Sequence, residues 1–398
     1  MFDWLKRKSI TSSGELKDAL FLAAAGSTAG VAVNETTALQ MATVFACARV
    51  RSESFAQLPV SVCEVQEDGT NAILRDHHLA ELFRNRPSGH QTPFEFLEKI
   101  CLDLDMGGNY YAVMQRRRGE VTSFLPLPAK DVTAEWDATA QRIVYTVPGL
   151  SVPGGDVLTS DQILHIKLMS RDGVTGLSPI RQAREAIGLG LAAERHGANT
   201  FRQGARPSGA VKIPHALEDS DYERLARQWN ENYSGENSGK TAILEMGAEF
   251  TPISMTNEDV QFLATRKYQR SEIAGIYRVP PHMIGDLDNA TFSNIEHQSL
   301  EFNMHAMAPL AKRVESAINR YVVPEKDRGR VYIKFNLDAL VRGDLATRMA
   351  AYSTAIQNGI HSPNEVRARE DYPPYDGGEV YLQPLNMAGA GGDQNEEM

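Results

Sequence analysis

A run of apolar residues in the C-terminal third of the chain constrains its fold most strongly. Its apolar residues recur at alternating spacings of four and three residues, which keeps them on one face of an α-helix. Its members are Leu300, Met304, Met307, Ala311, Val314, Ile318 and Tyr321. Ser293 and Glu296 have the spacing of a capping box, so we expect a helix over 294–323. Pro309 lacks an N–H and its ring opposes the carbonyl of His305, which predicts a long helix with a kink near that turn.

Two further helices are predicted before this one. Ser178-Pro179 combines an N-cap with proline at the first helical position and predicts a helix over 178–205. Small residues occur throughout it and would allow close packing, against copies of itself or within one chain. By itself this pattern favours an ordinary buried helix. Asn257 is expected to cap a helix over 257–279, which Pro280-Pro281 stops.

The residues from 39 to 170 have the pattern of one α+β unit. A helix is expected over 39–57, and Thr92 with Glu95 forms a capping box for a helix over 93–106. Arg118-Gly119 is expected to be the turn of a β-hairpin. The expected strands are 60–65, 110–115, 121–125, 143–147 and 163–167, with 331–337 returning to this unit.

The remaining segments are shorter. Residues 206–256 mix strand-like pieces with a helix around 221–233 and are expected to form a small insertion. Residues 344–374 are expected to be helical, with a capping box at Ser362 and Glu365. Residues 1–38 are expected to be a flexible arm and 388–398 a disordered, Gly-rich acidic tail.

Charge and cysteine content limit the classes of function. The formal net charge of −10 argues against tight binding to duplex DNA, which needs a clustered basic face, so any DNA is held loosely. The three cysteines, Cys47, Cys63 and Cys101, lack C-x-x-C spacing and are expected to be buried thiols in a reducing compartment. No apolar run reaches the roughly 18 residues needed to cross a bilayer, and 19–33 is a poor match to a secretory signal.

No catalytic, cofactor or metal site is predicted. Residues 235–241, GENSGKT, approach a phosphate-binding loop, but one residue is missing and a strand follows where a helix is needed. The string GLGLAA at 188–193 loosely matches a dinucleotide-binding fingerprint. It lies inside a predicted helix with no strand before it, so its glycines indicate helix packing. His77, His78, His297 and His305 have no metal-ligand spacing, so they are expected to be surface or core residues.

Five strings occur in an order that resembles the portal proteins of long-tailed phages with lambda-type heads. The strings are TVFACARVRSESFAQLPV (43–60), NRPSGHQTPFEF (85–96), GGNYYAVMQRRRGEVTSFLPLP (107–128), GLSPIRQAREAIGLG (176–190) and YRVPPHMIGDLDNATFSNIEHQ (277–298). Each string is weak by itself, but five in one order are specific. The resemblance covers roughly 39–374.

This resemblance implies an α+β portal fold with an α/β wing, a two-helix stem, a small clip containing β-strands, a long kinked helix and a helical crown. The implied segments are the wing at 39–177 with its returning strand 331–337, stem helices at 178–205 and 257–279, the clip at 206–256, a tunnel loop at 280–293, the kinked helix at 294–323 and the crown at 344–374. The same resemblance implies a ring of subunits, as a dodecamer.

Two groups of residues are then candidates for contact with DNA. In the tunnel loop they are Met283, Ile284, Asp286, Asp288 and Asn289, whose acids suit a channel wall that does not grip phosphates. On the stem they are Arg266, Lys267 and Arg270, which a ring would repeat into a basic belt. Pairing of these cations with carboxylates of neighbouring subunits is an equally open interpretation.

The implied function is that of a non-enzymatic portal subunit at one capsid vertex, a conduit for DNA packaging and ejection. Its implied partners are further copies of itself, the terminase large subunit, the major capsid protein, head completion or adaptor proteins, and double-stranded DNA held without sequence specificity. No membrane and no cofactor is expected. The implied location is the virion, after assembly in the host cytoplasm, with virion and prophage origin both open. The alternative is an ATP-dependent DNA-translocating or nuclease component of packaging.

Overall fold

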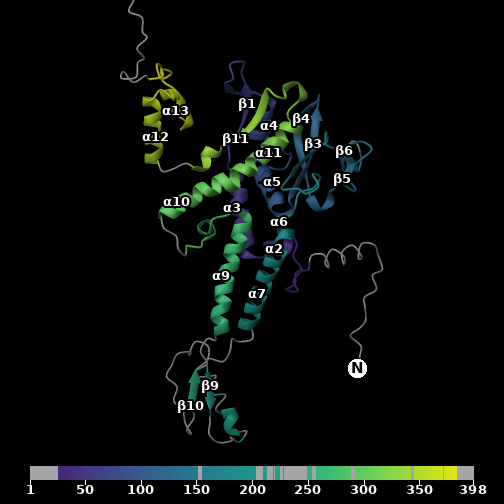
Figure 1. Ribbon diagram of the computed structural model, residues 1–398, viewed down its shortest axis with the longest axis vertical. Coiled ribbons are helices and arrows are strands. Elements are labelled where there is room, and N and C mark those ends of the chain that lie inside the picture. Colours follow the sequence, from purple (N-terminus) through teal and green to yellow (C-terminus); the bar gives the residue numbers. More distant parts are fainter. Residues whose placement is uncertain are drawn as a thin grey trace, which may run out of the picture.

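The chain forms a body from which two long helices project side by side toward a small two-stranded sheet (Figure 1). The computed structural model describes residues 26–150, 155–202, 209–212, 218, 220–224, 227, 249–252, 257–287, 292–341, 345–370 and 372–382. The predictions for residues 1–25, for the loop-like string 235–241 and for the tail 388–398 lie outside the described residues.

The body contains three antiparallel sheets of three strands each, with the orders β11-β1-β2, β4-β3-β8 and β5-β6-β7. Their strands are β1 (Val60–Val65), β2 (Asn71–Ile73), β3 (Asn109–Arg117), β4 (Glu120–Leu127), β5 (Thr133–Asp137), β6 (Arg142–Thr146), β7 (Val157–Thr159), β8 (Ile163–Lys167) and β11 (Val331–Phe335). The predicted hairpin turn is present, with Arg118 and Gly119 both at positive φ. β11 pairs with β1, so the predicted return of the chain near residue 331 is confirmed.

Helices cover these sheets and close the core. They are α2 (Glu35–Leu39), α3 (Ala42–Ala56), α4 (His78–Asn85), α5 (Pro93–Gly107) and α11 (Ala308–Tyr321). Phe55 of α3 lies 5.0 Å from Phe335 between ring centroids, and Phe96 of α5 stacks on Phe124 at 5.1 Å. All four rings are buried, and each contributes roughly 1.5–3 kcal/mol by leaving water.

The junction after α5 is fixed by backbone geometry. The predicted capping box at its start is present, and the helix ends in left-handed Gly108. A Cβ on Gly108 would lie 2.3 Å from the carbonyl oxygen of Leu177, and a Cβ on Gly176 would lie 2.1 Å from the carbonyl oxygen of Gly108. Only residues without side chains let these two backbones approach so closely.

The first of the two projecting helices begins differently from the prediction. Ser178 does cap a helix, but this helix, α6 (Pro179–Gln182), ends at Ala183, and α7 (Arg184–Arg202) follows it. The second projecting helix is α9 (Asn257–Tyr277). Asn257 is its first helical residue and therefore not its cap, because a cap residue has a non-helical backbone.

Residues 26–38 are part of the folded body, so their assignment to a flexible arm is wrong. Val31, Val33 and Ala38 are buried, because this segment packs against α7. A Cβ on Gly188 would lie 2.3 Å from Ser27 Oγ, and one on Gly190 would lie 2.5 Å from Met41 Cε. The small residues at these two positions thus serve packing within one chain.

The predicted long helix is interrupted by a different backbone form. It consists of α10 (Phe292–Glu301), a π-helical segment η4 (Phe302–Met307) and α11. Of the apolar residues predicted to share one helical face, Met307, Ala311, Val314 and Ile318 are buried. Leu300 and Met304 are exposed. The wider π turn rotates the buried face, so Phe302 and Ala306 fill the core instead.

The start of α10 also differs from the prediction. Ser293 is already helical because α10 begins at Phe292, and it therefore cannot be the N-cap of the predicted capping box.

The C-terminal helices α12 (Leu345–Gln357) and α13 (Pro363–Arg369) lie apart from the body in Figure 1. The capping box at Ser362 and Glu365 is present. At the other end of the molecule, β9 (Gly209–Lys212) pairs with β10 (Glu249–Pro252), whereas most of 206–256 lies outside the described residues. Among the described helices, none has the length and apolar character needed to cross a membrane. All three cysteines are free and buried, as predicted.

Candidate functional site

The two projecting helices are the most distinctive feature of the molecule. Side by side, α7 and α9 connect the body with the β9–β10 sheet (Figure 1). Near the middle, Arg266 of α9 donates to Glu194 of α7, with 3.2 Å between Nη2 and Oε1. This pair is partly exposed, so it contributes little stability but marks the facing sides of the helices.

The loop that follows α9 packs back onto the body. Pro280 ends the helical path, Pro281–Ile284 (η3) forms a 3-10 turn, and Gly285 adopts a left-handed conformation with φ of 75°. Met283 and Ile284 are half-buried and pack against the core. His282 Nδ1 lies 2.9 Å from Gln298 Oε1 of α10, which ties the loop to the next helix.

The structure brings the two groups of predicted site residues together. Arg266, Lys267, Arg270 and Asp286 line one cavity of about 220 Å³ between α9, the loop and α7. Arg270 also donates from Nη2 to the carbonyl oxygen of Ile284. The three cations therefore lie beside the loop carboxylate instead of forming a separate feature. Asp288 and Asn289 lie outside the described residues.

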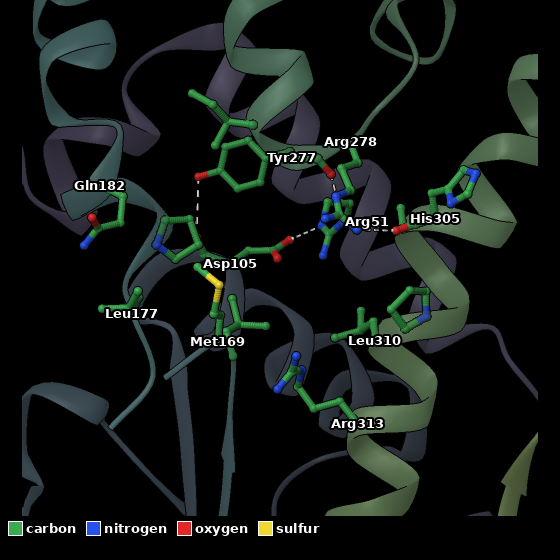
Figure 2. A pocket seen from close by; sticks show the side chains of 15 residues that line it. Arg51, Asp105, Met169, Leu177, Gln182, Tyr277, Arg278, His305, Leu310 and Arg313 are labelled. Atoms are coloured by element: carbon green, nitrogen blue, oxygen red, sulfur yellow. Dashed lines mark hydrogen bonds and ion pairs between the residues drawn. The ribbon is translucent and has the colours of Figure 1, made fainter. Parts of the chain in front are cut away.

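A buried ion pair anchors the C-terminal end of α9. Sequence reasoning missed this pair. Arg51 of α3 donates to Asp105 of α5, with 2.7 Å between Nε and Oδ2, and its Nη1 donates to the carbonyl oxygen of Tyr277 at 2.8 Å (Figure 2). One signal was available. Arg51 occupies the same helical face as Val44, Ala48 and Phe55, where a cation needs a buried partner.

Burial and charge act in opposite directions on this pair. Burial raises the pKa of the Asp105 carboxyl, and Arg51 lowers it by less, so the net shift is upward. Burial lowers the pKa of the Arg51 guanidinium. The charge of Asp105, its hydrogen bond and the neighbouring Cys101 and Tyr277 together more than offset this, so the pKa lies above the ordinary value.

The same region holds a second cavity, of about 330 Å³, where α9, α6 and the long helix meet (Figure 2). Arg278, at the end of α9, has a left-handed backbone with φ of 55° and donates from Nη1 to the carbonyl oxygen of His305 at 2.8 Å. In a regular helix that carbonyl would accept from residue 309, but Pro309 has no N–H. Arg278 therefore gives this carbonyl a donor from outside the helix.

The histidines at 297 and 305 and the glycines at 188 and 190 all lie in helical segments. Among the described residues, no group of three or more His, Cys, Asp or Glu side chains is arranged to hold a metal ion. His297 is exposed on α10 and His305 is exposed in η4. The helical location of Gly188 and Gly190 agrees with their interpretation as packing residues.

Known sequences similar to this chain include proteins of two phages. The family described as "Phage portal protein" matches residues 42–371. The "Probable portal protein" of Streptomyces phage phiC31 is 34% identical over 375 residues, which is 91% of this chain and 81% of that protein. The "Portal protein" of Enterobacteria phage HK97 is 32% identical over 356 residues, 88% of this chain and 83% of that protein.

Solved structures share the fold. One, described as "Virion of native gene transfer agent (GTA) particle", has a TM-score of 0.62 at 22% identity and covers 90% of this chain and 99% of its own. Another, "Neck of native GTA particle computed with C12 symmetry", has a TM-score of 0.59 at 23% identity and covers 90% of this chain and 100% of its own. The α+β fold is thus shared with components of virus-like particles.

Proposed function

Because the chain belongs to the phage portal protein family, we propose that copies of it form a ring at one vertex of a phage or phage-like head, through which DNA enters and leaves. The family assigns the chain the role of a portal subunit and a place in the particle. The ring, the channel and the assignment of segments to wing, stem, clip, tunnel loop and crown are proposals for this chain.

One observation carries this proposal: α7 and α9 project from the body side by side as an antiparallel pair of helices. Such a pair, repeated around an axis, would build a wall between the body and the β9–β10 sheet. A contact between unlike surfaces of neighbouring copies closes into a ring when the rotation permits. The relative with C12 symmetry supports twelve copies as the expected number.

The net charge of −10 supports a channel that lets DNA slide. A wall with little excess positive charge displaces few counterions from DNA and so binds it weakly. In this proposal Met283, Ile284 and Asp286 of the loop lie nearest the DNA, together with Asp288 and Asn289. Arg266, Lys267 and Arg270 form the basic belt, weakened locally by Glu194 and Asp286 in the same cavity.

The proposed partners follow from the position of a portal. The β9–β10 end is proposed to dock the terminase large subunit and later the head completion or adaptor proteins, and the body is proposed to contact the major capsid protein. The role is structural, without catalysis or a cofactor. An ATP-dependent DNA translocase or nuclease would need the string 235–241 to bind nucleotide, and a titration with ATP tests this directly.

The test of the proposal is negative-stain electron microscopy of the purified full-length chain. The expected images show rings with a central hole and a mass close to twelve subunits. A sample that remains monomeric at concentrations and salt conditions that support assembly of portal proteins would overturn the proposal.

A further inference from the structure

We propose that the cavity of about 330 Å³ beside the upper end of α9 is the docking site for α10 of a second copy of this chain. The inference rests on the proposed function, because it names the contact by which neighbouring subunits of the ring hold one another.

The cavity combines an apolar floor with a basic rim. Leu168, Leu177 and Leu310 provide apolar lining, and Met169 is 68% exposed at its edge. Arg278 and Arg313 are exposed and donate only to backbone carbonyls, at 2.8 Å to His305 and 2.9 Å to Lys167.

These two rim cations lack a carboxylate partner. Within the parts of the chain that the structure describes, neither Arg278 nor Arg313 forms an ion pair, and the only carboxylate lining the cavity, Asp105, is already paired with Arg51. The rim therefore presents uncompensated positive charge beside apolar surface. A partner that fits it carries acidic and apolar side chains together.

The exposed face of α10 has this combination. Glu296 and Leu300 of α10 and Met304 of the adjoining η4 recur every four residues, and Glu301 lies next to Leu300. All four are exposed, with Leu300 at 43% and Met304 at 65%. The π-helical segment keeps both apolar side chains outside the core. Neither glutamate forms an ion pair with another described residue.

The geometry of the long helix directs this face to another copy. His305, Pro309 and Leu310 line the cavity from the same continuous helix that carries Leu300. A helix cannot fold its first turns back onto its own later turns, so the face on α10 can fill only a neighbour's cavity. Because the two surfaces differ, the contact is head-to-tail, which is the type that closes rings.

Cross-linking between two single variants tests the proposal. Leu300→Cys and Met169→Cys chains are mixed, assembled and treated with a short bismaleimide, while the native cysteines stay unreactive because they are buried. The expected result is a covalent dimer in the mixture and none with either variant alone. The matched control pairs Leu300→Cys with Val157→Cys on β7, a residue 52% exposed and outside both surfaces, and should give no dimer.

A charge exchange provides a second readout. Glu301→Arg or Arg313→Glu alone should weaken ring assembly about tenfold, and the two together in one chain should restore it. Rings that form but give no dimer in the Leu300→Cys and Met169→Cys mixture would overturn this inference and leave the proposed function intact. Dimers from Leu300→Cys alone would also overturn it, because α10 would then meet α10. An unaltered chain that forms no ring fails the proposed function instead.

Discussion

At the scale of single residues, the body is held together by charges and glycines whose partners are remote in sequence. Asp105 lies 54 residues from Arg51, and Tyr277, whose carbonyl accepts from the same guanidinium, lies 226 residues from it. The apolar face around Arg51 indicates that it needs a buried partner, but no local pattern identifies that partner as Asp105. The helices carrying them could be predicted from periodicity and caps, but the ion pair between them could not.

Breaking the buried pair is the first prediction. Asp105→Asn or Arg51→Ala should lower the free energy of unfolding by about 3–5 kcal/mol, since either change leaves a buried group without its charge partner. Urea unfolding measures this. The matched control is Glu53→Gln at the exposed Arg49–Glu53 pair, where a loss of at most about 0.5 kcal/mol is expected. Equal losses at the two pairs would contradict the assigned role of Arg51.

Glycine geometry gives the second prediction. Gly108→Ala should destabilise the chain by well over about 1 kcal/mol, because positive φ and a collision with the Leu177 carbonyl act together. Gly119→Ala has similar backbone strain, with φ of 85°, but nothing within 4 Å of its Cβ, so its cost should stay near about 1 kcal/mol. Thermal melting measures the loss of stability in both variants. The loss should be larger in Gly108→Ala, where a steric collision adds to the backbone strain.

At the scale of elements, polar contacts lock neighbouring segments together. Neutral His165 of β8 donates from Nε2 to Oδ1 of Asn109 at 3.0 Å, and its Nδ1 accepts from the Tyr145 hydroxyl at 3.2 Å. The same amide oxygen accepts from the N–H of Gly176. This chain of contacts connects two sheets with the segment that leads into α6.

The third prediction concerns pH. Burial, with a smaller contribution from Lys167, lowers the pKa of His165 from 6.5 to about 3, so the folded chain keeps the imidazole neutral. The contribution of His165 to stability is therefore complete above pH 6.5 and is lost as pH falls toward 3. Between pH 6.5 and 5 the loss should approach about 2 kcal/mol.

Urea unfolding of the unaltered chain, of His165→Asn and of His297→Asn, measured across that pH range, checks this. The His165 variant should lose most of the pH dependence, and the variant at exposed His297 should retain it. An unchanged slope in His165→Asn would refute the assignment.

The junction between α9 and the long helix gives the fourth prediction. Arg278→Ala should destabilise the chain by about 1–2 kcal/mol, because the His305 carbonyl loses its donor. In a Pro309→Ala background the helix regains an N–H at residue 309, so the same change should cost less. A double-mutant cycle should give a coupling of about 1 kcal/mol. Strictly additive effects would mean that Arg278 does not compensate for the proline.

At the scale of the whole molecule, the sequence predicted the order of elements well, and their exact form less well. Caps, prolines and turn residues located α5, α6, α9 and α13 within a few residues. The π turn could not be predicted, because periodicity alone does not reveal an inserted residue. The spacing therefore assigned Leu300 and Met304 to the same helical face as Met307, although both are exposed. The packing of 26–38 was missed because no local signal identifies Gly188 as its partner.

The proposed function depends on α7 and α9 forming the wall of a shared channel. A cryo-electron microscopy reconstruction of the assembled chain tests this most directly. The proposed function predicts a closed ring in which each subunit contributes this helix pair to the channel between the body and the β9–β10 sheet. A ring whose channel is lined by the β5–β6–β7 sheet, with α7 and α9 on its outer surface, would contradict it.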